Sequence, residues 1–335
     1  MKKEQNYSLQ HLHTFHLSIK TRWFWEYKNE AELIQILHDE YFQKQRVLHI
    51  GGGSNLLFTN DFDGIIFHSA IKGITLTEES DHTVLLRIAA AEIWDDVVEY
   101  AVNKGWGGIE NLSFIPGETG AAAVQNIGAY GIEIKDVIEK VEAISTLDCK
   151  KRVFSNSDCA YDYRSSFFKS NPNHIITYVT LRLQKHPELH LEYGNLKGIG
   201  NADEPVSIRQ VRDTVMAIRR EKLPDPAELG NAGSFFLNPV VKPERLAQLV
   251  EDYPSIPYYP TTNGYFKLSA GWLVEQCGLK GKRFGAVGVY EHHALVIVNY
   301  GDATGNDIVQ LANHICDAVH QLFGVRLETE VKYVQ

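Results

Sequence analysis

Apolar positions recur along the chain with two different spacings, and these predict a succession of helices and strands. Asn29 and Glu32 form the residue pair that is typical of a helix capping box. Behind them, apolar residues return every three or four positions, as they do on one face of a helix. We therefore predict a helix here, with an apolar face that comprises Leu33, Ile34, Leu37 and Tyr41.

Two strands flank a glycine-rich turn in the next segment. Val47–Ile50 predicts a short strand that runs directly into the sequence Gly51-Gly52-Gly53-Ser54-Asn55. A second apolar strand is predicted from Gly64 to Ile71. Strand, glycine loop and strand thus follow one another.

The same patterns predict a second unit that again mixes strands and helices. Thr83–Ala90 is a predicted strand, and a helix that Gly105 ends comes after it. The apolar face of this helix comprises Trp94, Val97, Val98, Ala101 and Val102.

Two further helices are predicted in the second half of the chain. One begins at Ser207, where Gln210 completes a capping box, and ends before Leu223-Pro224-Asp225-Pro226. The two prolines indicate a domain junction. The other carries apolar residues from Ile308 to Leu322 and is ended by Gly324, and a strand from Val325 to Val334 is predicted behind it. The pattern as a whole predicts a mixed α+β architecture in about three pieces.

Composition narrows the class of protein. At 335 residues the chain is long enough for two or three domains, and its 44% hydrophobic and 22% charged residues are typical of a globular protein. A net charge of −9 argues against nucleic-acid binding. The four cysteines are far apart, which argues against a disulfide framework or a zinc site, and no run of 18 apolar residues occurs. We expect a cytoplasmic protein that does not span a membrane.

Two glycine-rich stretches are candidates for binding a cofactor. In the first, Gly51–Gly53 let backbone amides approach a phosphate, although a tight turn between strands would need the same residues. Neither GxGxxG nor GxxxxGK[ST] occurs in the chain, so a dinucleotide would need another scaffold. In the second, residues 115–131, small residues are dense and Gln125, Asn126 and Tyr130 supply the polar groups. This stretch is typical of a flavin site, and a close-packed core loop is the alternative.

The motifs together resemble the UDP-N-acetylenolpyruvoylglucosamine reductase (MurB) family. The resemblance starts with GGGSNLL from Gly51 and IPGETGAAAVQNIGAYG from Ile115, and continues through YDYRSSF from Tyr161, KLPDP from Lys222, NAGSFFLNP from Asn231 and LETEV from Leu327. It implies an α+β protein with the two-subdomain FAD-binding fold of the vanillyl-alcohol-oxidase/MurB type and a C-terminal α+β substrate-binding domain. The FAD would be bound non-covalently. The cofactor-binding residues it implies are Gly51, Gly52, Gly53, Ser54, Asn55, Leu56, Pro116, Gly117, Gly120, Ala121, Asn126, Gly128 and Ala129.

The resemblance also implies a reaction in peptidoglycan precursor synthesis and a catalytic trio. UDP-N-acetylenolpyruvoylglucosamine would be reduced to UDP-N-acetylmuramate, with NADPH as the hydride donor and FAD as the carrier. The trio would be Arg164, Ser234 and Glu330. Arg164 would face the carboxylate, where charge develops, Ser234 would be the general acid, and Glu330 would donate a hydrogen bond if burial kept it protonated.

Each member of the trio also has a purely structural interpretation. Arg164 could form a salt bridge with Asp162 or another acid, and Ser234 could be an ordinary turn serine. Glu330 shares one face of the predicted last strand with Arg326, Glu328 and Lys332, which is typical of a solvated face. The family pattern, and not the residue types alone, favours the catalytic roles.

The resemblance further implies a set of substrate-binding residues: Tyr130, Tyr193, Lys222, Asn238, Tyr259 and Lys267. The sequence Tyr193-Gly194 suggests the family's first subtype, in which an extra loop carries a tyrosine over the substrate. His13 stands where the family usually has asparagine, and His292-His293 where an amide residue commonly binds substrate. We expect no metal site at the paired histidines, because no further ligand spacing supports one.

The expected organisation comprises three domains. FAD-binding subdomain 1 spans residues 1–72, FAD-binding subdomain 2 spans 73–223, and the substrate-binding domain spans 224–324. The last strand, near 325–335, could return to subdomain 1. We expect a monomer. Two other functions are open at this point: another flavin oxidase or dehydrogenase of the same fold, and a catalytically inactive flavoprotein that binds nucleotide sugars.

Overall fold

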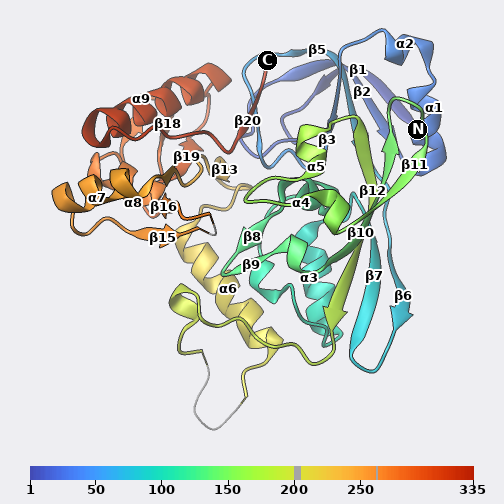
Figure 1. The fold of residues 1–335 in the computed structure, drawn as a ribbon. Coiled ribbons are helices and arrows are strands. Elements are labelled where there is room, and N and C mark those ends of the chain that lie inside the picture. Colours follow the sequence, from blue (N-terminus) through green and yellow to red (C-terminus); the bar gives the residue numbers. More distant parts are fainter. Residues whose placement is uncertain (200–204, 262) are drawn as a thin grey trace. The chain divides into compact units, whose positions relative to one another are not determined.

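The computed structural model describes residues 1–199, 205–261 and 263–335 (Figure 1). The chain divides into two compact units. Unit 1 comprises residues 1–7, 21–52 and 63–219, and unit 2 comprises residues 8–20, 53–62 and 220–335. Each unit is therefore built from segments that lie far apart in the sequence. None of the helices in the described residues is long and apolar enough to cross a membrane.

The first sheet of unit 1 has the strand order β1-β2-β5-β3. Its strands are β1 (Lys2–Ser8), β2 (Lys20–Tyr27), β5 (Phe62–Ser69) and β3 (Val47–Ile50), and β3 pairs with β5 in parallel. Two helices lie between β2 and β3 in the chain, α1 (Glu30–Leu37) and α2 (Glu40–Gln43). One hydrophobic core joins α1, α2 and this sheet through buried side chains, including Leu33, Ile36, Phe42, Ile65 and Phe67.

The second sheet of unit 1 is antiparallel and has the order β11-β10-β12-β7-β6. Its strands are β11 (Lys151–Ser155), β10 (Ile138–Ser145), β12 (His174–Gln184), β7 (Thr83–Ala89) and β6 (Ile74–Glu79). Alternation along β7 places Ile88 in the core shared with α3 (Trp94–Asn103) and α4 (Thr119–Gln125), and Ala89 in the core shared with the first sheet. Figure 1 shows α3 and α4 beside this sheet.

Short elements and one long helix complete unit 1. The hairpin of β8 (Gly128–Ala129) and β9 (Ile132–Glu133) follows α4, and α5 (Phe167–Ser170) precedes β12. The helix α6 (Ile208–Lys222) belongs to unit 1 up to Arg219. The 3-10 turns are η1 (Glu110–Leu112), η2 (Ile134–Asp136), η3 (Ser157–Cys159) and η4 (Gly194–Leu196).

Unit 2 contains three small sheets and three helices among its described residues. The largest sheet has the order β13 (Gly230–Ser234), β19 (Val296–Asn299), β18 (Val287–Val289) and β17 (Arg283–Phe284). A second has the order β14 (Val240–Val241), β16 (Phe266–Leu268) and β15 (Tyr258–Pro260). In the third, β4 (Leu56–Phe58) pairs in parallel with β20 (Lys332–Val334). The helices are α7 (Pro243–Asp252), α8 (Ala270–Gln276) and α9 (Gly305–Phe323).

The predicted helix ends are largely confirmed by their capping contacts. Asn29 accepts the amide of Glu32 at the start of α1, and Ser207 and Gln210 exchange hydrogen bonds at the start of α6. Gly324 ends α9 with a left-handed backbone at φ 61°. These ends were predictable because the capping residue itself is visible in the sequence.

Two predicted elements are wrong in extent. The first helix stops at Leu37, and Tyr41 lies in the separate helix α2, because the side chain of Asp39 caps a new helix start. The predicted strand from Val325 to Val334 is formed by Lys332–Val334 alone. Before it, the main chain bonds with residues 235–237 instead: Glu330 donates to Phe235, and Leu237 donates to Glu328.

Candidate active site

The two glycine-rich stretches meet within unit 1. A Cβ atom on Gly51 would lie 3.0 Å from Oε2 of Glu118 and 3.4 Å from Cβ of Ala121, and one on Gly52 would lie 3.6 Å from Cα of Gly117. Space for larger side chains is therefore lacking where the loops approach each other. The structure thus brings together residues that the sequence separates by more than sixty positions, as a shared cofactor site requires.

The carboxylate of Glu118 is held by a histidine from the first sheet. His68, on β5, lies 3.0 Å from Oε1 of Glu118 through Nε2, and its other nitrogen lies 3.7 Å from Oε2 of Glu26. At the helical end of the loop, the amides of Thr119 and Gly120 donate to the carbonyls of Glu92 and Ala90. The start of α4 is thereby fixed to the sheet beside the glycines.

Further along the second stretch, the groups that are present fit a flavin. In α4, Ala122 and Ala123 are buried in the core of unit 1, whereas Ala121, beside Gly51, is only half-buried. At its end, Oε1 of Gln125 is buried and has no hydrogen-bond partner among the described residues. A buried acceptor without a partner is costly unless a ligand or water supplies a donor. A flavin offers both a flat ring for the small residues and ring N–H groups for such an acceptor.

The side chain of Asn126 forms its hydrogen bonds within the protein. Its side chain is fully buried, donates to Glu133 at 3.2 Å and to the carbonyl of Asp162 at 2.9 Å, and accepts the amide of Lys135 at 3.2 Å. These bonds hold its left-handed backbone, at φ 47°, where α4 ends. The amide therefore organises the loop, and a contact between Asn126 and the cofactor would fall to its main chain.

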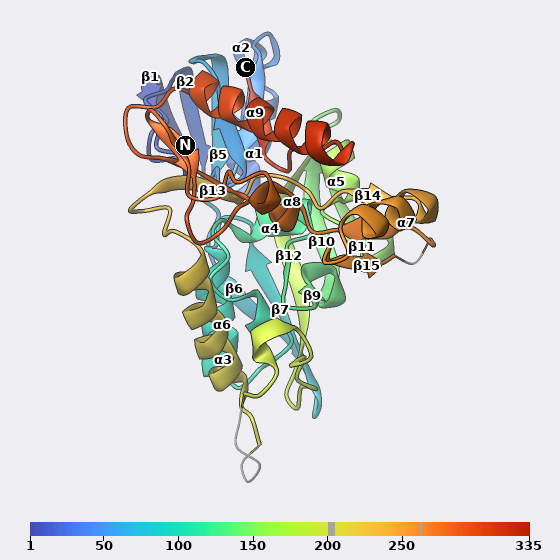
Figure 2. The ribbon, with the colours of Figure 1, turned by 90° about the vertical axis from the view of Figure 1, so that its left-hand side faces the viewer.

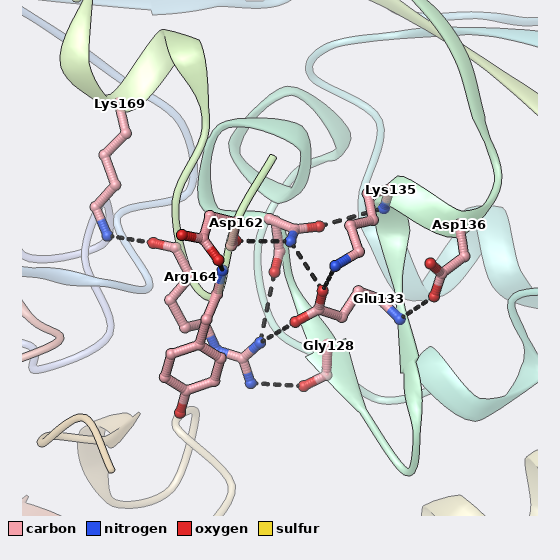
Figure 3. Close-up of polar contacts among 9 residues, drawn as sticks. Gly128, Glu133, Lys135, Asp136, Asp162, Arg164 and Lys169 are labelled. Atoms are coloured by element: carbon pink, nitrogen blue, oxygen red, sulfur yellow. Dashed lines mark hydrogen bonds and ion pairs between the residues drawn. The ribbon is translucent and has the colours of Figure 1, made fainter. Parts of the chain in front are cut away.

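Arg164 lies between η3 and α5, and its guanidinium points to the segment that follows α4 (Figure 3). Its Nη2 donates to the carbonyl of Gly128 at 2.7 Å, and its Nη1 to the carbonyl of Asn126 at 3.4 Å. Oε1 of Glu133 lies 4.0 Å from Nη1. The two carbonyls orient the guanidinium against the end of the second glycine-rich stretch.

The acid beside Arg164 is shared with a second cation. Oε2 of Glu133 lies 2.5 Å from Nζ of Lys135. The hydrogen bond to Glu133 and the negative charge of Glu133 raise the pKa of Lys135. Figure 3 shows Glu133 between Lys135 and Arg164. Arg164 thus has an acidic neighbour in Glu133, at 4.0 Å, and the backbone carbonyl of Asp162 binds Asn126.

Two candidate substrate-binding tyrosines lie together in unit 1. The rings of Tyr130 and Tyr193 are 6.2 Å apart and nearly perpendicular, and Tyr193 is 55% exposed. Tyr130 has a left-handed backbone at φ 49°. Burial raises the pKa of its phenol, so it stays neutral and can donate a hydrogen bond at neutral pH.

In unit 2, Ser234 ends a strand that is bent by a buried asparagine. Asn231 is 2% exposed; its Oδ1 accepts the amide of Gly233, and its Nδ2 donates to the carbonyls of Pro224 and Leu229. Gly233 has φ 67°, and the register of β13 against β19 shifts between Asn231 and Ser234. The bulge presents Ser234 half-buried, so it is not an ordinary exposed turn serine.

Glu330 is brought near the same segment and near the first glycine-rich loop. Its amide donates to the carbonyl of Phe235, the residue after Ser234, at 2.9 Å. Its carbonyl accepts Nδ2 of Asn55 at 3.2 Å. Glu330 is half-buried whereas Glu328 is exposed, so the solvated-face interpretation holds for Glu328 and not for Glu330. Ser234 and Glu330, 96 positions apart, are therefore neighbours along paired backbones.

The remaining residues of the first loop also have partners in unit 2. A Cβ atom on Gly53, which has φ 62°, would lie 2.1 Å from the carbonyl oxygen of Leu12. The carbonyl of Ser54 accepts the hydroxyl of Thr14 at 3.5 Å, and Leu56 pairs with Lys332. Glycine is required at position 53 both by φ and by space.

The other candidate substrate residues in unit 2 form one pair and two separate positions. Tyr259 and Lys267 are directly opposite each other on β15 and β16, so their side chains share a face. Oδ1 of Asn238 accepts the amide of Ala270 at the start of α8 at 2.9 Å. Lys222 is exposed at the end of α6.

Comparison with known proteins decides between the remaining functions. Residues 225–334 match the C-terminal domain of UDP-N-acetylenolpyruvoylglucosamine reductase, and residues 23–148 match an FAD binding domain. The chain is 49% identical to the UDP-N-acetylenolpyruvoylglucosamine reductase of Porphyromonas gingivalis strain ATCC 33277, over 98% of both chains. It is 43% identical to that of Bacteroides fragilis strain ATCC 25285, over 99% of this chain and 100% of the relative.

The chain belongs to the MurB family. A crystal structure of the family's enzyme from Thermus caldophilus has the same fold, with a TM-score of 0.70 at 22% identity over 100% of this chain and 98% of that one. Membership confirms the predicted fold class, the FAD cofactor with NADPH as reductant, and the reductase activity in peptidoglycan precursor synthesis.

The histidines that depart from the MurB pattern lie in a buried position and in a turn. Nδ1 of His13 is buried without a hydrogen-bond partner among the described residues. His13 is 2% exposed, and Nε2 lies 3.2 Å from the carbonyl of Leu17; burial lowers the pKa of its imidazole to about 4, so it is neutral. His292 and His293 lie in the turn before β19 and not on a strand. The described residues contain no group of three or more His, Cys, Asp or Glu side chains that could hold a metal ion.

Sequence reasoning missed the residues that hold the MurB motifs in place. Glu133 and Lys135 lie beside Arg164, Asn231 binds the amide of Gly233 next to Ser234, and His68 binds Glu118 next to Gly117. Each of them contacts a candidate site residue or its immediate neighbour. Asn231 could have been found, since it lies within NAGSFF. His68 and Glu118 are 50 positions apart with no shared pattern.

Proposed function

We propose that Arg164, Ser234 and Glu330 carry the reduction of the enolpyruvyl group. FAD, once reduced by NADPH, would supply the hydride for the terminal carbon of the double bond. Arg164 stabilises the negative charge that then develops on the substrate carboxylate, because a guanidinium binds a carboxylate in two-pronged geometry. Ser234 donates the proton from Oγ to the neighbouring carbon. Glu330, protonated, donates a hydrogen bond to the charged intermediate.

The observation that carries this proposal is the setting of Arg164. Its guanidinium is held by two carbonyls of the predicted cofactor loop, those of Asn126 and Gly128. These bonds fix a permanent cation beside the loop that would hold the cofactor, where the carboxylate of the substrate would have to lie. The pairing of the Glu330 amide with Phe235 supports the joint assignment of Ser234 and Glu330.

The proposal extends to the cofactor and substrate contacts. Residues 51–56 and 116–129 would hold FAD, with Gly51, Gly52 and Gly117 admitting it closely and Gln125 supplying an acceptor. The substrate would be UDP-N-acetylenolpyruvoylglucosamine, held by Tyr130, Tyr193, Lys222, Asn238, Tyr259 and Lys267. Cationic lysines suit its diphosphate. The contact between Tyr130 and Tyr193 supports assignment to the first subtype, whose loop tyrosine covers the substrate.

The domain organisation and cellular context are also proposals. FAD-binding subdomains would span 1–72 and 73–223, and the substrate-binding domain would span 224–324. We propose a monomeric, cytoplasmic enzyme, in line with the four unpaired cysteines, Cys149, Cys159, Cys277 and Cys316.

The test separates the two half-reactions. Ser234→Ala should slow anaerobic flavin reoxidation by UDP-N-acetylenolpyruvoylglucosamine at least about a hundredfold, since a positioned general acid contributes about that much. Flavin reduction by NADPH should stay near the wild-type rate. Ser255→Ala, an exposed serine of the same unit, is the matched control and should leave both rates unchanged. Equal losses in both half-reactions would contradict the proton-donor role.

A further inference from the structure

Phe114, which directly precedes the second glycine-rich stretch, has a left-handed backbone at φ 59°. A large side chain is disfavoured in this region because Cβ crowds the following carbonyl, and the cost is concentrated in one residue. Such a conformation persists only where surrounding contacts enforce it. The direction in which Ile115-Pro116-Gly117 leave Phe114 depends on this backbone conformation.

A partly buried ion pair binds the amide of Phe114. The amide donates to Oδ1 of Asp95 at 2.5 Å, and Asp95 accepts both guanidinium nitrogens of Arg212, at 2.6 and 3.0 Å. Arg212 is 3% exposed. Burial alone would raise the pKa of Asp95, but the hydrogen bonds from Arg212 and Phe114 hold it below its ordinary value, so Asp95 is ionised.

A second arginine binds the other side of the same peptide unit. Nε of Arg219 donates to the carbonyl of Phe114 at 3.0 Å. Arg212 and Arg219 are seven residues apart on α6, so they lie two turns apart on one face, and Figure 2 shows α6 alongside α3, which carries Asp95. Side chains from two helices thus hold both the N–H and the C=O of Phe114.

The far end of the loop is already fixed by main-chain bonds. Gly117 accepts the amide of Trp94, and the amides of Thr119 and Gly120 donate to Glu92 and Ala90. At the start of the loop, the contacts of Phe114 with Asp95 and Arg219 have this role. If these contacts were lost, Phe114 would relax to an ordinary backbone conformation, and the start of the loop would move with it.

We propose that Asp95, Arg212 and Arg219 are positioning residues that hold Phe114 in its left-handed conformation and thereby hold residues 115–120 in the form that binds FAD. This inference rests on the proposed cofactor site. The three residues act through the main chain of Phe114 and need not touch the cofactor. They form the Phe114 clamp.

The decisive experiment varies the clamp and the strained residue together. Arg219→Met removes the donor to the Phe114 carbonyl, and it is made in two backgrounds, Phe114→Ala and Phe114→Gly. Both backgrounds lack the phenyl ring, but alanine keeps the strain of a positive φ and glycine does not. The dissociation constant of FAD is measured on each apoprotein by the change in flavin fluorescence, with thermal melting as a check of folding.

The clamp predicts a background-dependent result. Arg219→Met should raise the dissociation constant of FAD about tenfold in the alanine background, because left-handed strain in a non-glycine residue corresponds to roughly 5- to 30-fold in a population. In the glycine background the increase should be less than about threefold. Asp95→Asn should show the same dependence. Arg209→Met, on the same helix but bonded to Asn103, is the matched control and should leave the constant unchanged.

Three results would overturn the inference. If Arg219→Met weakens FAD equally in both backgrounds, Arg219 acts on the cofactor directly and not through Phe114. If it weakens FAD in neither, the clamp has no role in binding. If the wild-type chain itself binds no FAD, the proposed cofactor site fails and this inference fails with it, an outcome that the wild-type titration separates from the other two.

Discussion

Replacement of Gly128 by alanine tests the setting of Arg164 with a single methyl group. The new Cβ would lie 2.9 Å from Nη1 of Arg164 and 2.8 Å from Cγ of Glu133. Gly128 does not have a positive φ, so the backbone can accept alanine. Both of these atoms belong to side chains that can move, and the third near atom, the carbonyl oxygen of Ile132 at 3.1 Å, needs to shift by only a few tenths of an ångström. The substitution should therefore displace Arg164 while leaving the fold intact.

The magnitude follows from the hydrogen bond between Nη2 of Arg164 and the carbonyl of Gly128, which is 2.7 Å long. A hydrogen bond to a charged group contributes about 1.5–3 kcal/mol. Only 22% of the Arg164 side chain is exposed, so solvent weakens this bond little. If the transition state loses the whole stabilisation from this hydrogen bond, flavin reoxidation by substrate should slow about 10- to 150-fold.

The assay is anaerobic stopped-flow absorbance of the flavin in each half-reaction. Reoxidation by UDP-N-acetylenolpyruvoylglucosamine should slow, and reduction by NADPH should not. Gly271→Ala, in α8, is the matched control, because its nearest neighbour would be Cγ of Leu295 at an ordinary 3.6 Å. Wild-type reoxidation in Gly128→Ala would refute the reasoning, since it would mean that the position of Arg164 does not matter.

Two predictions concern stability. Burial alone would raise the pKa of Glu142, but the hydrogen bonds and charges of Arg87 and Lys151 lower it to about 2. A depressed carboxyl pKa stabilises the fold above the unfolded value of about 4.5, and this contribution, about 3 kcal/mol, is lost as pH falls from there through about 2. Glu142→Gln should therefore lower the free energy of unfolding at pH 7, measured by urea denaturation. In the variant this free energy should fall less steeply between about pH 4.5 and pH 2 than in the wild type, and an equally steep fall would contradict the prediction. Thr304→Ala removes the acceptor for the Asp307 amide in the capping box of α9 and should cost about 1 kcal/mol in the same assay, whereas no loss would show that the helix start is held by its packing alone.

Local patterns predicted the elements whose cause is local. The starts of α1 and α6 and the end of α9 depend on residues within three positions of each other, so their capping residues could be recognised directly. The last strand failed for the opposite reason. Alternation from Val325 to Glu328 is real in the burial of the side chains and is broken at the exposed Thr329. Strand formation also depends on a partner, and residues 235–237 pair with this segment only in isolated bonds.

The candidate site shows the same division. The family motifs identified Arg164, Ser234 and Glu330, and residue chemistry supplied a role for each. What could not be predicted is the set of contacts made across long sequence separations, such as Glu133 beside Arg164 and Asn55 on Glu330. No periodicity or propensity connects such pairs, because the fold alone places them together.

Four of the strained residues of unit 1 share one method of support. Phe114, Asn126, Tyr130 and Arg164 all have a left-handed backbone, and all lie in or against the proposed cofactor loop. In each case polar side chains hold the strained residue or its peptide groups: the Phe114 clamp, the amide of Asn126 itself, Asn111 on the carbonyl of Tyr130, and Lys169 on the carbonyl of Arg164.

Left-handed backbone at four non-glycine residues is a cost that packing of the loop alone would not offset. The supporting side chains come from helices and hairpins fixed to the five-stranded sheet, so the stability of that sheet is transmitted to the loop. A loop held in this way loses little conformational freedom when it binds a ligand. The strain is therefore best understood as preorganisation. It follows that relieving strain at one position while its support remains should change cofactor affinity little, whereas removing the support while the strain remains should weaken it.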